Sequence, residues 1–131
     1  MGDVNWLAVS VAAIATFVIG GLWYSPLLFY KKWAALVGMT PEKQGKGHPA
    51  LTYGVSFILS FAAAFVFSLF LGANPEPGFA VGAGISAGLF WVAGSFGINY
   101  LFEQKPLSLF LINGGYHTLQ FTAYGLVFGL M

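Results

Sequence analysis

A stripe of polar side chains lies inside an apolar segment near the C-terminus. The spacings i+3 or i+4, i+7 and i+11 place its five members on one face of a helix. They are Asn113, Tyr116, His117, Gln120 and Tyr124. At ~1.5 Å per residue, counted from Leu107, His117 lies about 15 Å along that helix, near the middle of a bilayer. An ionisable group is costly in lipid, so this face is expected to point into the protein or toward water.

Two kinds of chemistry fit this stripe. In the first, a neutral His117 bonds to a Ser or Thr of a neighbouring helix, while Asn113 and Gln120 join helices through their amides. In the second, the stripe lines a polar cavity for a solute, water or a lipid headgroup, and His117 titrates. A haem or metal site is disfavoured, because the other histidine, His48, lies in the first loop and no carboxylate lies deep in the membrane. We therefore expect no metal and no cofactor.

A second polar group gathers where the first and third predicted helices approach the same membrane surface. We predict a vestibule on the cytoplasmic side, built from Trp23, Tyr24, Ser25, Asn99, Tyr100 and Glu103. An interfacial aromatic belt is the alternative for the aromatic residues. For Glu103, a plain charge pair with Lys105 is the alternative. Pro26 withholds the donor that Leu22 needs in a helix, so the first helix is predicted to bend there.

The elements that position these residues follow from the scarcity of charge. Charged residues make up 7% of the 131 residues, against about 25% in an ordinary soluble domain, and hydrophobic residues make up 58%. Four charge-free runs are each long enough to cross a bilayer. The sequence therefore predicts a single all-α domain over residues 1–131, an integral membrane bundle of four transmembrane helices near 5–30, 50–72, 78–102 and 107–130.

Lysine positions predict how this bundle sits in the membrane. All five lysines lie in the loops after the first and third helices, and none lies on the other side. Short loops rich in lysine face the cytoplasm. Both termini and the proline-rich turn 74–78 are therefore expected on the non-cytoplasmic side. The first loop is predicted to lie on the cytoplasmic surface against anionic lipids, or to act only as a topology signal.

Small residues recur every fourth position along the second predicted helix and in pairs along the third. Such spacing lets helix backbones approach closely, either within one chain or between copies. The predicted packing positions are Ser56, Ser60, Ala64, Ser68, Gly72, Gly84 and Gly88. This pattern predicts that the second and third helices make the closest backbone contacts.

Four segments resemble a known family. These are Asn5–Val9, Leu22–Phe29, Asn99–Glu103 and Leu109–His117, of which Trp-Tyr-Ser-Pro and Asn-Gly-Gly-Tyr-His are the most specific parts. Together they resemble the bacterial family called domain of unknown function 1761, over nearly the whole chain. Gln104-Lys105 departs from the two basic residues expected there. The resemblance implies a small multi-pass protein of the bacterial inner membrane, and it implies no activity.

Several function classes are disfavoured by composition. The chain has no Cys, no Arg, no acid pair on one helical face and no base beside a convincing nucleophile, so we expect no enzyme. A net charge of +1 without arginine disfavours nucleic acid as a partner. Two classes remain: a structural or accessory subunit that forms a homo-oligomer or joins a larger membrane complex, and a small-solute or ion channel or transporter that uses the polar stripe.

Overall fold

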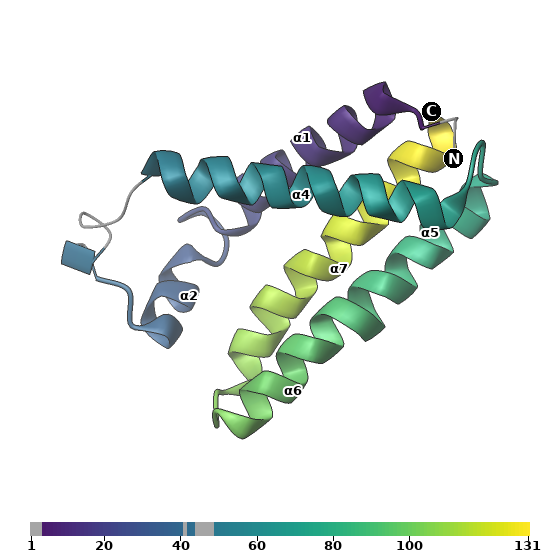
Figure 1. Cartoon of the computed structure of the whole chain (residues 1–131). Helices are drawn as coiled ribbons and strands as arrows, with labels where there is room; N and C mark the ends of the chain where they lie inside the picture. The colour runs from purple at the N-terminus through teal and green to yellow at the C-terminus, as the bar shows by residue number, and fades with distance from the viewer. Residues whose placement is uncertain (1–3, 41, 44–48) are drawn as a thin grey trace.

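The computed structural model describes residues 4–40, 42–43 and 49–131, and this part of the chain is helical without strands. Figure 1 shows the arrangement. The elements are α1 (Trp6–Trp23), α2 (Tyr30–Val37), α4 (Pro49–Leu71), α5 (Pro77–Ser86), the π-helix η1 (Ala87–Ala93), α6 (Gly94–Phe102) and α7 (Leu107–Leu130). The elements α5, η1 and α6 follow one another without a break and form a single helix over Pro77–Phe102.

The described residues thus form five helices, and the predicted number of four is wrong. The predicted ranges 50–72, 78–102 and 107–130 differ from the observed helices by at most one residue at either end. The range 5–30 does not form one helix, because α1 ends at Trp23 and a turn leads into α2. The short helix α2 lies partly in the segment that was predicted to be the first loop.

The Ser25–Pro26 pair explains why α1 stops instead of bending. Pro26 cannot donate to the carbonyl of Leu22. The Ser25 hydroxyl donates to that carbonyl over 2.7 Å, and the Ser25 backbone N–H also donates to it over 3.2 Å. The chain then turns, and the Tyr30 N–H bonds to the Ser25 carbonyl over 3.1 Å at the start of α2. Ser25 therefore replaces the hydrogen bond that proline removes.

Within the part of the chain that the structure describes, three helices are long and apolar enough to cross a membrane: α1, α4 and the continuous helix Pro77–Phe102. The predicted fourth span, α7, has 24 residues and no charged side chain, yet it is not among them. The polar residues of its stripe lower its mean hydropathy. Whether α7 can cross a membrane therefore depends on which groups its polar side chains contact.

The helices pair unevenly. In Figure 1, α7 runs beside the continuous helix α5–η1–α6, whereas α4 crosses α7 and packs against α1. The start of α1, the end of α7 and the turn between α4 and α5 lie at one end of the molecule. The turn between α6 and α7 lies at the other end (Figure 1). The start of α1 and the end of α7 are thus near each other.

Glycines allow α5–η1 and α7 to pack backbone against backbone. A Cβ atom at Gly84 would collide with the Phe121 carbonyl oxygen of α7. At Gly88 it would lie 2.8 Å from the carbonyl oxygen of His117, and at Gly129 it would lie 2.8 Å from Pro77 Cα. Such close contacts leave no room for any larger side chain. The tightest helix pair is therefore the third and fourth predicted helices.

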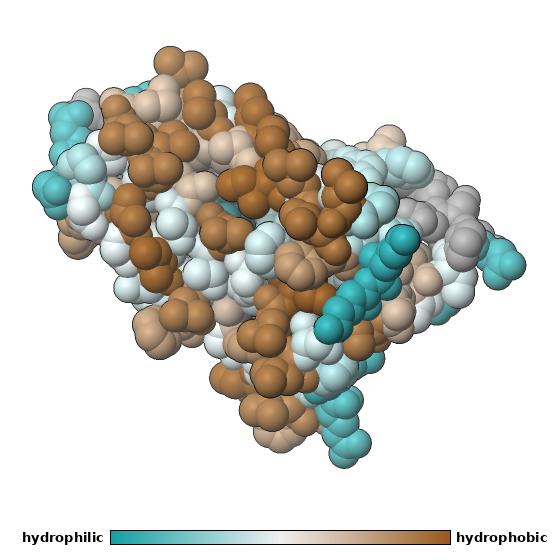
Figure 2. All heavy atoms as spheres, turned by 180° about the vertical axis from the view of Figure 1, so that it is seen from behind, coloured by the Kyte–Doolittle hydropathy of each residue, from teal (hydrophilic) through white to brown (hydrophobic). Residues whose placement is uncertain are grey.

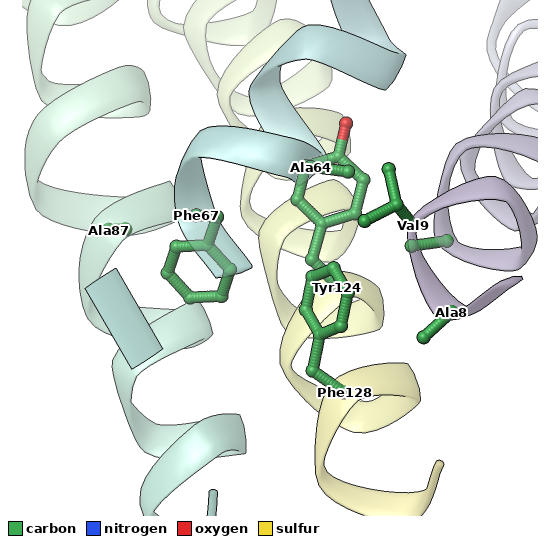
Figure 3. Packing of buried hydrophobic residues seen from close by; sticks show 8 residues of the cluster. Ala8, Val9, Ala64, Phe67, Ala87, Tyr124 and Phe128 are labelled. Atoms are coloured by element: carbon green, nitrogen blue, oxygen red, sulfur yellow. The ribbon is translucent and has the colours of Figure 1, made fainter. Parts of the chain in front are cut away.

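The hydrophobic core fills the space where α1, α4 and α7 meet. Figure 3 shows Tyr124 and Phe128 of α7 projecting between α1, which carries Val9, and α4, which carries Ala64 and Phe67. Tyr124 and Ala64 are fully buried. Phe67 lies against the rings of Tyr124 and Phe128 at centroid separations of 6.4 and 6.5 Å. This core joins the end of α7 to α1 and α4.

Glu76 closes the turn between α4 and α5. Its two carboxylate oxygens accept hydrogen bonds from the backbone N–H groups of Gly78 (2.9 Å) and Phe79 (2.8 Å). These bonds favour the charged form and hold the pKa of the Glu76 carboxyl below its ordinary value of 4.5. The contribution of this cap to stability is present above pH 4.5 and is lost as the pH falls through the folded-state pKa.

The surface agrees with a membrane environment. Figure 2 shows hydrophobic residues over the middle of one face, while hydrophilic residues gather toward its edges. Many large apolar side chains are exposed, among them Leu27, Ile58, Phe70, Phe90 and Leu111. A soluble monomer seldom exposes apolar surface of this extent.

Candidate functional site: a polar seam along α7

Asn113 connects three helices through its side-chain amide. The hydroxyl of Tyr24, at the end of α1, donates to Asn113 Oδ1 over 2.7 Å. Asn113 Nδ2 in turn donates to the hydroxyl of Tyr100 on α6 over 2.7 Å. One amide thus ties α7 to both α1 and α6.

Two further bonds tie α1 to the same part of α7. The indole Nε1 of Trp23 donates to the carbonyl of Ile112 over 2.8 Å. The Tyr116 hydroxyl donates to the carbonyl of Thr16 over 3.2 Å, and the Tyr116 ring meets that of Tyr24 edge to face at 5.5 Å. The aromatic residues at the end of α1 are therefore anchored to α7.

A second network crosses the middle of the bundle. The Gln120 amide nitrogen donates to the Tyr124 hydroxyl over 2.7 Å. That hydroxyl lies 2.7 Å from Ser60 Oγ and donates to the Ser60 carbonyl over 3.0 Å. Ser60 Oγ lies 2.9 Å from the Thr16 hydroxyl of α1. The network joins α1, α4 and α7 through groups that are all buried.

This network also assigns the protonation of His117. The Ser60 carbonyl can only accept, so the Tyr124 hydroxyl donates to it and accepts from Gln120. The Gln120 oxygen is thereby turned toward His117, whose Nδ1 lies 2.6 Å away. Because that oxygen can only accept, Nδ1 carries the proton. The ring also stacks on Phe96 of α6, with centroids 5.0 Å apart and planes at 12°.

These contacts pair every residue of the stripe with another group of the same chain. Among the residues that the structure describes, no buried side-chain nitrogen or oxygen lacks a hydrogen-bond partner. The same residues contain no group of three or more His, Cys, Asp or Glu side chains placed to hold a metal ion. Chemically, the arrangement holds helices together, and we name it the polar seam: Thr16, Tyr24, Ser60, Tyr100, Asn113, Tyr116, His117, Gln120 and Tyr124.

The residues predicted as a vestibule divide into two sets. Trp23, Tyr24 and Tyr100 contact α7 at Ile112 and Asn113. The other three take no part in that contact. The Ser25 hydroxyl donates to the Leu22 carbonyl of α1, and Asn99 and Glu103 are exposed.

The predicted small-residue positions also divide. Ser60 and Ala64 are buried, while Ser56 and Gly72 are exposed. Ser68 is half-buried and donates to the Phe65 carbonyl within α4. Gly84 and Gly88 face α7. The buried part of the stripe on α4 therefore lies at its meeting point with α1 and α7.

Thr16 is the seam residue that sequence reasoning missed. The other hydroxyl residue of α1, Ser10, lies six positions away on a different face, so no helical stripe marks Thr16 and periodicity does not find it. The available signal was its type, because a buried hydroxyl in lipid needs a partner. Here its hydroxyl bonds to the Ala13 carbonyl over 3.0 Å and lies against Ser60.

Comparison with known proteins gives a family and no activity. A search of the curated proteins found no match, and neither did a search of the solved structures. The profile of one family, described as "Protein of unknown function (DUF1761)", matches residues 7–129. That match covers the two most specific segments of the resemblance, the one around Trp23 and the one around His117. The chain therefore belongs to the DUF1761 family.

Proposed function

We propose that the protein is a non-enzymatic structural or accessory module of a membrane, which acts by associating with copies of itself or with a larger membrane complex. The observation that carries the proposal is the polar seam. Asn113 and Gln120, the two amides expected to line a pathway, are each bonded at both ends of the amide to residues of the same chain. A channel or transporter would keep such dipoles free for its cargo.

We further propose that α7 is the fourth membrane span. Its length of 24 residues is sufficient, and its polar side is paired with α1, α4 and α6. The side left over carries exposed leucines, namely Leu111, Leu119 and Leu126. A helix that pairs its polar face inside a bundle and exposes leucine to lipid can cross a bilayer despite a lower mean hydropathy.

Four crossings place both termini on one side of the membrane. The lysines of α2 and of the turn before α7 belong to the opposite end of the molecule, which is proposed to face the cytoplasm. The termini and the Glu76 turn are then non-cytoplasmic. For a bacterial member of the family, this membrane is the inner, cytoplasmic one.

Purification in a mild detergent tests the proposed role. The full chain, extracted from its native membrane, is expected to run as a symmetric oligomer or with a defined partner in fixed stoichiometry, as measured by size-exclusion chromatography with light scattering. A chain that runs alone as a monomer under several mild detergents contradicts the proposal. So does ion or solute flux in liposomes that the Asn113→Ala variant abolishes.

A further inference from the structure

An apolar groove lies between α4 and the helix that begins at α5. It has a volume of about 330 Å³, and its walls are mainly aromatic, with one polar side chain, that of Ser86. The aromatic residues that line it are Phe67, Phe70, Phe79, Phe90 and Trp91. The groove forms because α4 and α5 meet at their turn and diverge beyond it (Figure 1). It lies apart from the polar seam.

The groove follows the direction of the helix axis. Phe79, near the start of α5, and Trp91, within η1, both line it on one continuous helix. At ~1.5 Å per residue these twelve steps span about 18 Å. One leaflet contributes about half of a hydrocarbon core that is roughly 30 Å thick. The groove is thus about as deep as one leaflet, measured from the end that carries the Glu76 turn.

The groove is too narrow to enclose a helix. Spread over about 18 Å, its volume of about 330 Å³ corresponds to a mean cross-section of roughly 18 Å². An α-helix about 10 Å wide has a cross-section of roughly 80 Å². A flexible hydrocarbon chain can extend along it and contact aromatic walls on both sides. We propose that this groove binds one acyl chain of a phospholipid from the leaflet that contains the α4–α5 turn.

The negative charge of Glu76, at the Phe79 end of the groove, favours one kind of lipid headgroup. Phe79 begins the groove, and its backbone N–H is bonded to the carboxylate of Glu76. The turn at residues 72–77 contains no Lys, Arg or His, so it offers no cationic side chain to an anionic headgroup. A headgroup with an ammonium group complements the carboxylate. The ligand is accordingly a zwitterionic lipid such as phosphatidylethanolamine. This inference adds a ligand to the proposed association role and depends on the proposed membrane placement.

Native mass spectrometry of the purified chain tests the proposal. The protein is exchanged into detergent with equal amounts of phosphatidylethanolamine and phosphatidylglycerol. We expect one retained phosphatidylethanolamine per chain in the wild type. Ser86→Phe, which fills the groove from an exposed position, should lower its retention at least fivefold. Ser95→Phe is the matched control, because Ser95 is exposed on the same continuous helix and does not line the groove.

Equal retention in the two variants overturns the proposal, as does equal retention of the two lipids or retention of detergent alone. Loss of a dimer, instead of a lipid, in Ser86→Phe also overturns it. Tryptophan fluorescence gives a second reading that does not depend on how Ser86→Phe folds. Lipids brominated along the acyl chain should quench the wild type more than Trp91→Phe, because Trp91 lines the groove. Equal fractional quenching counts against the groove as the lipid site.

This lipid test is separable from the oligomer test above. An oligomeric chain without a retained lipid removes the groove ligand and leaves the association role standing. A monomer that retains one lipid supports the groove ligand and contradicts the association role.

Discussion

Gly84→Ala is expected to destabilise the protein by about 2–3 kcal/mol, because the added methyl group must push α5 away from α7. The neighbouring atom is the backbone carbonyl oxygen of Phe121, which cannot rotate out of the way. Alanine gains at most about 1 kcal/mol over glycine in helix propensity, so the collision outweighs it. Equilibrium unfolding in mixed micelles of sodium dodecyl sulfate and dodecyl maltoside, followed by circular dichroism, measures the difference.

Gly82→Ala is the matched control for this change. Gly82 lies two residues earlier on the same helix, and a Cβ atom placed there meets nothing within 4 Å. Its stability should be unchanged or slightly higher than that of the wild type. If both variants lose the same amount, the tight α5–α7 contact is not what stabilises this helix pair.

Asn113→Ala is expected to lower the free energy of unfolding by about 1–3 kcal/mol. The substitution removes the acceptor of the Tyr24 hydroxyl and the donor to the Tyr100 hydroxyl. Hydrogen bonds between membrane helices average about 0.6 kcal/mol each, and leaving a partner unpaired adds to the loss. The same micelle titration measures the effect, and Trp fluorescence should report separation of Trp23 from α7.

Asn99→Ala is the control for loss of an asparagine. Asn99 is exposed on α6, close to the membrane surface predicted for the vestibule, and its side chain has no hydrogen bond within the described part of the chain. Its removal should change stability by less than about 0.5 kcal/mol. A large loss from Asn99→Ala, with none from Asn113→Ala, would contradict the assignment of Asn113 as the connection between helices.

Sequence reasoning located three of the long helices, because charge-free runs and prolines mark their ends. Pro77 and Pro106 stand at helix starts, where a missing N–H does no harm. It did not find that α1 ends at Trp23. Proline alone predicts a bend, and the hydroxyl of Ser25, which allows a full break, is recognised only once its bond to Leu22 is seen. The π-helix η1 has no sequence signature that periodicity can detect.

The polar stripe on α7 could be predicted, but its role could not. Helical spacing places Asn113 and Gln120 on one face whether that face meets water or other helices. The decision depends on partners from distant parts of the chain, above all Tyr24, Ser60 and Thr16. Spacing within one helix carries no information about them. For the same reason, the spacing of the glycines in α5 and α7 does not predict that these two helices pack against each other.

We propose that the polar seam joins helices and does not line an aqueous path. The chain contains no cysteine, so single cysteines can be placed without removing any native thiol. The most direct measurement is the reaction of such cysteines, in sealed vesicles of known orientation, with a thiol reagent that cannot cross the membrane. The positions to substitute are Asn113, Tyr116, His117, Gln120 and Tyr124, with Asn74 in the α4–α5 turn as the accessible reference. We predict that Asn74→Cys reacts from the non-cytoplasmic side only, while the five seam positions stay unreactive from both sides in folded protein. Rapid labelling of successive seam positions from either side would show that the seam lines an aqueous path.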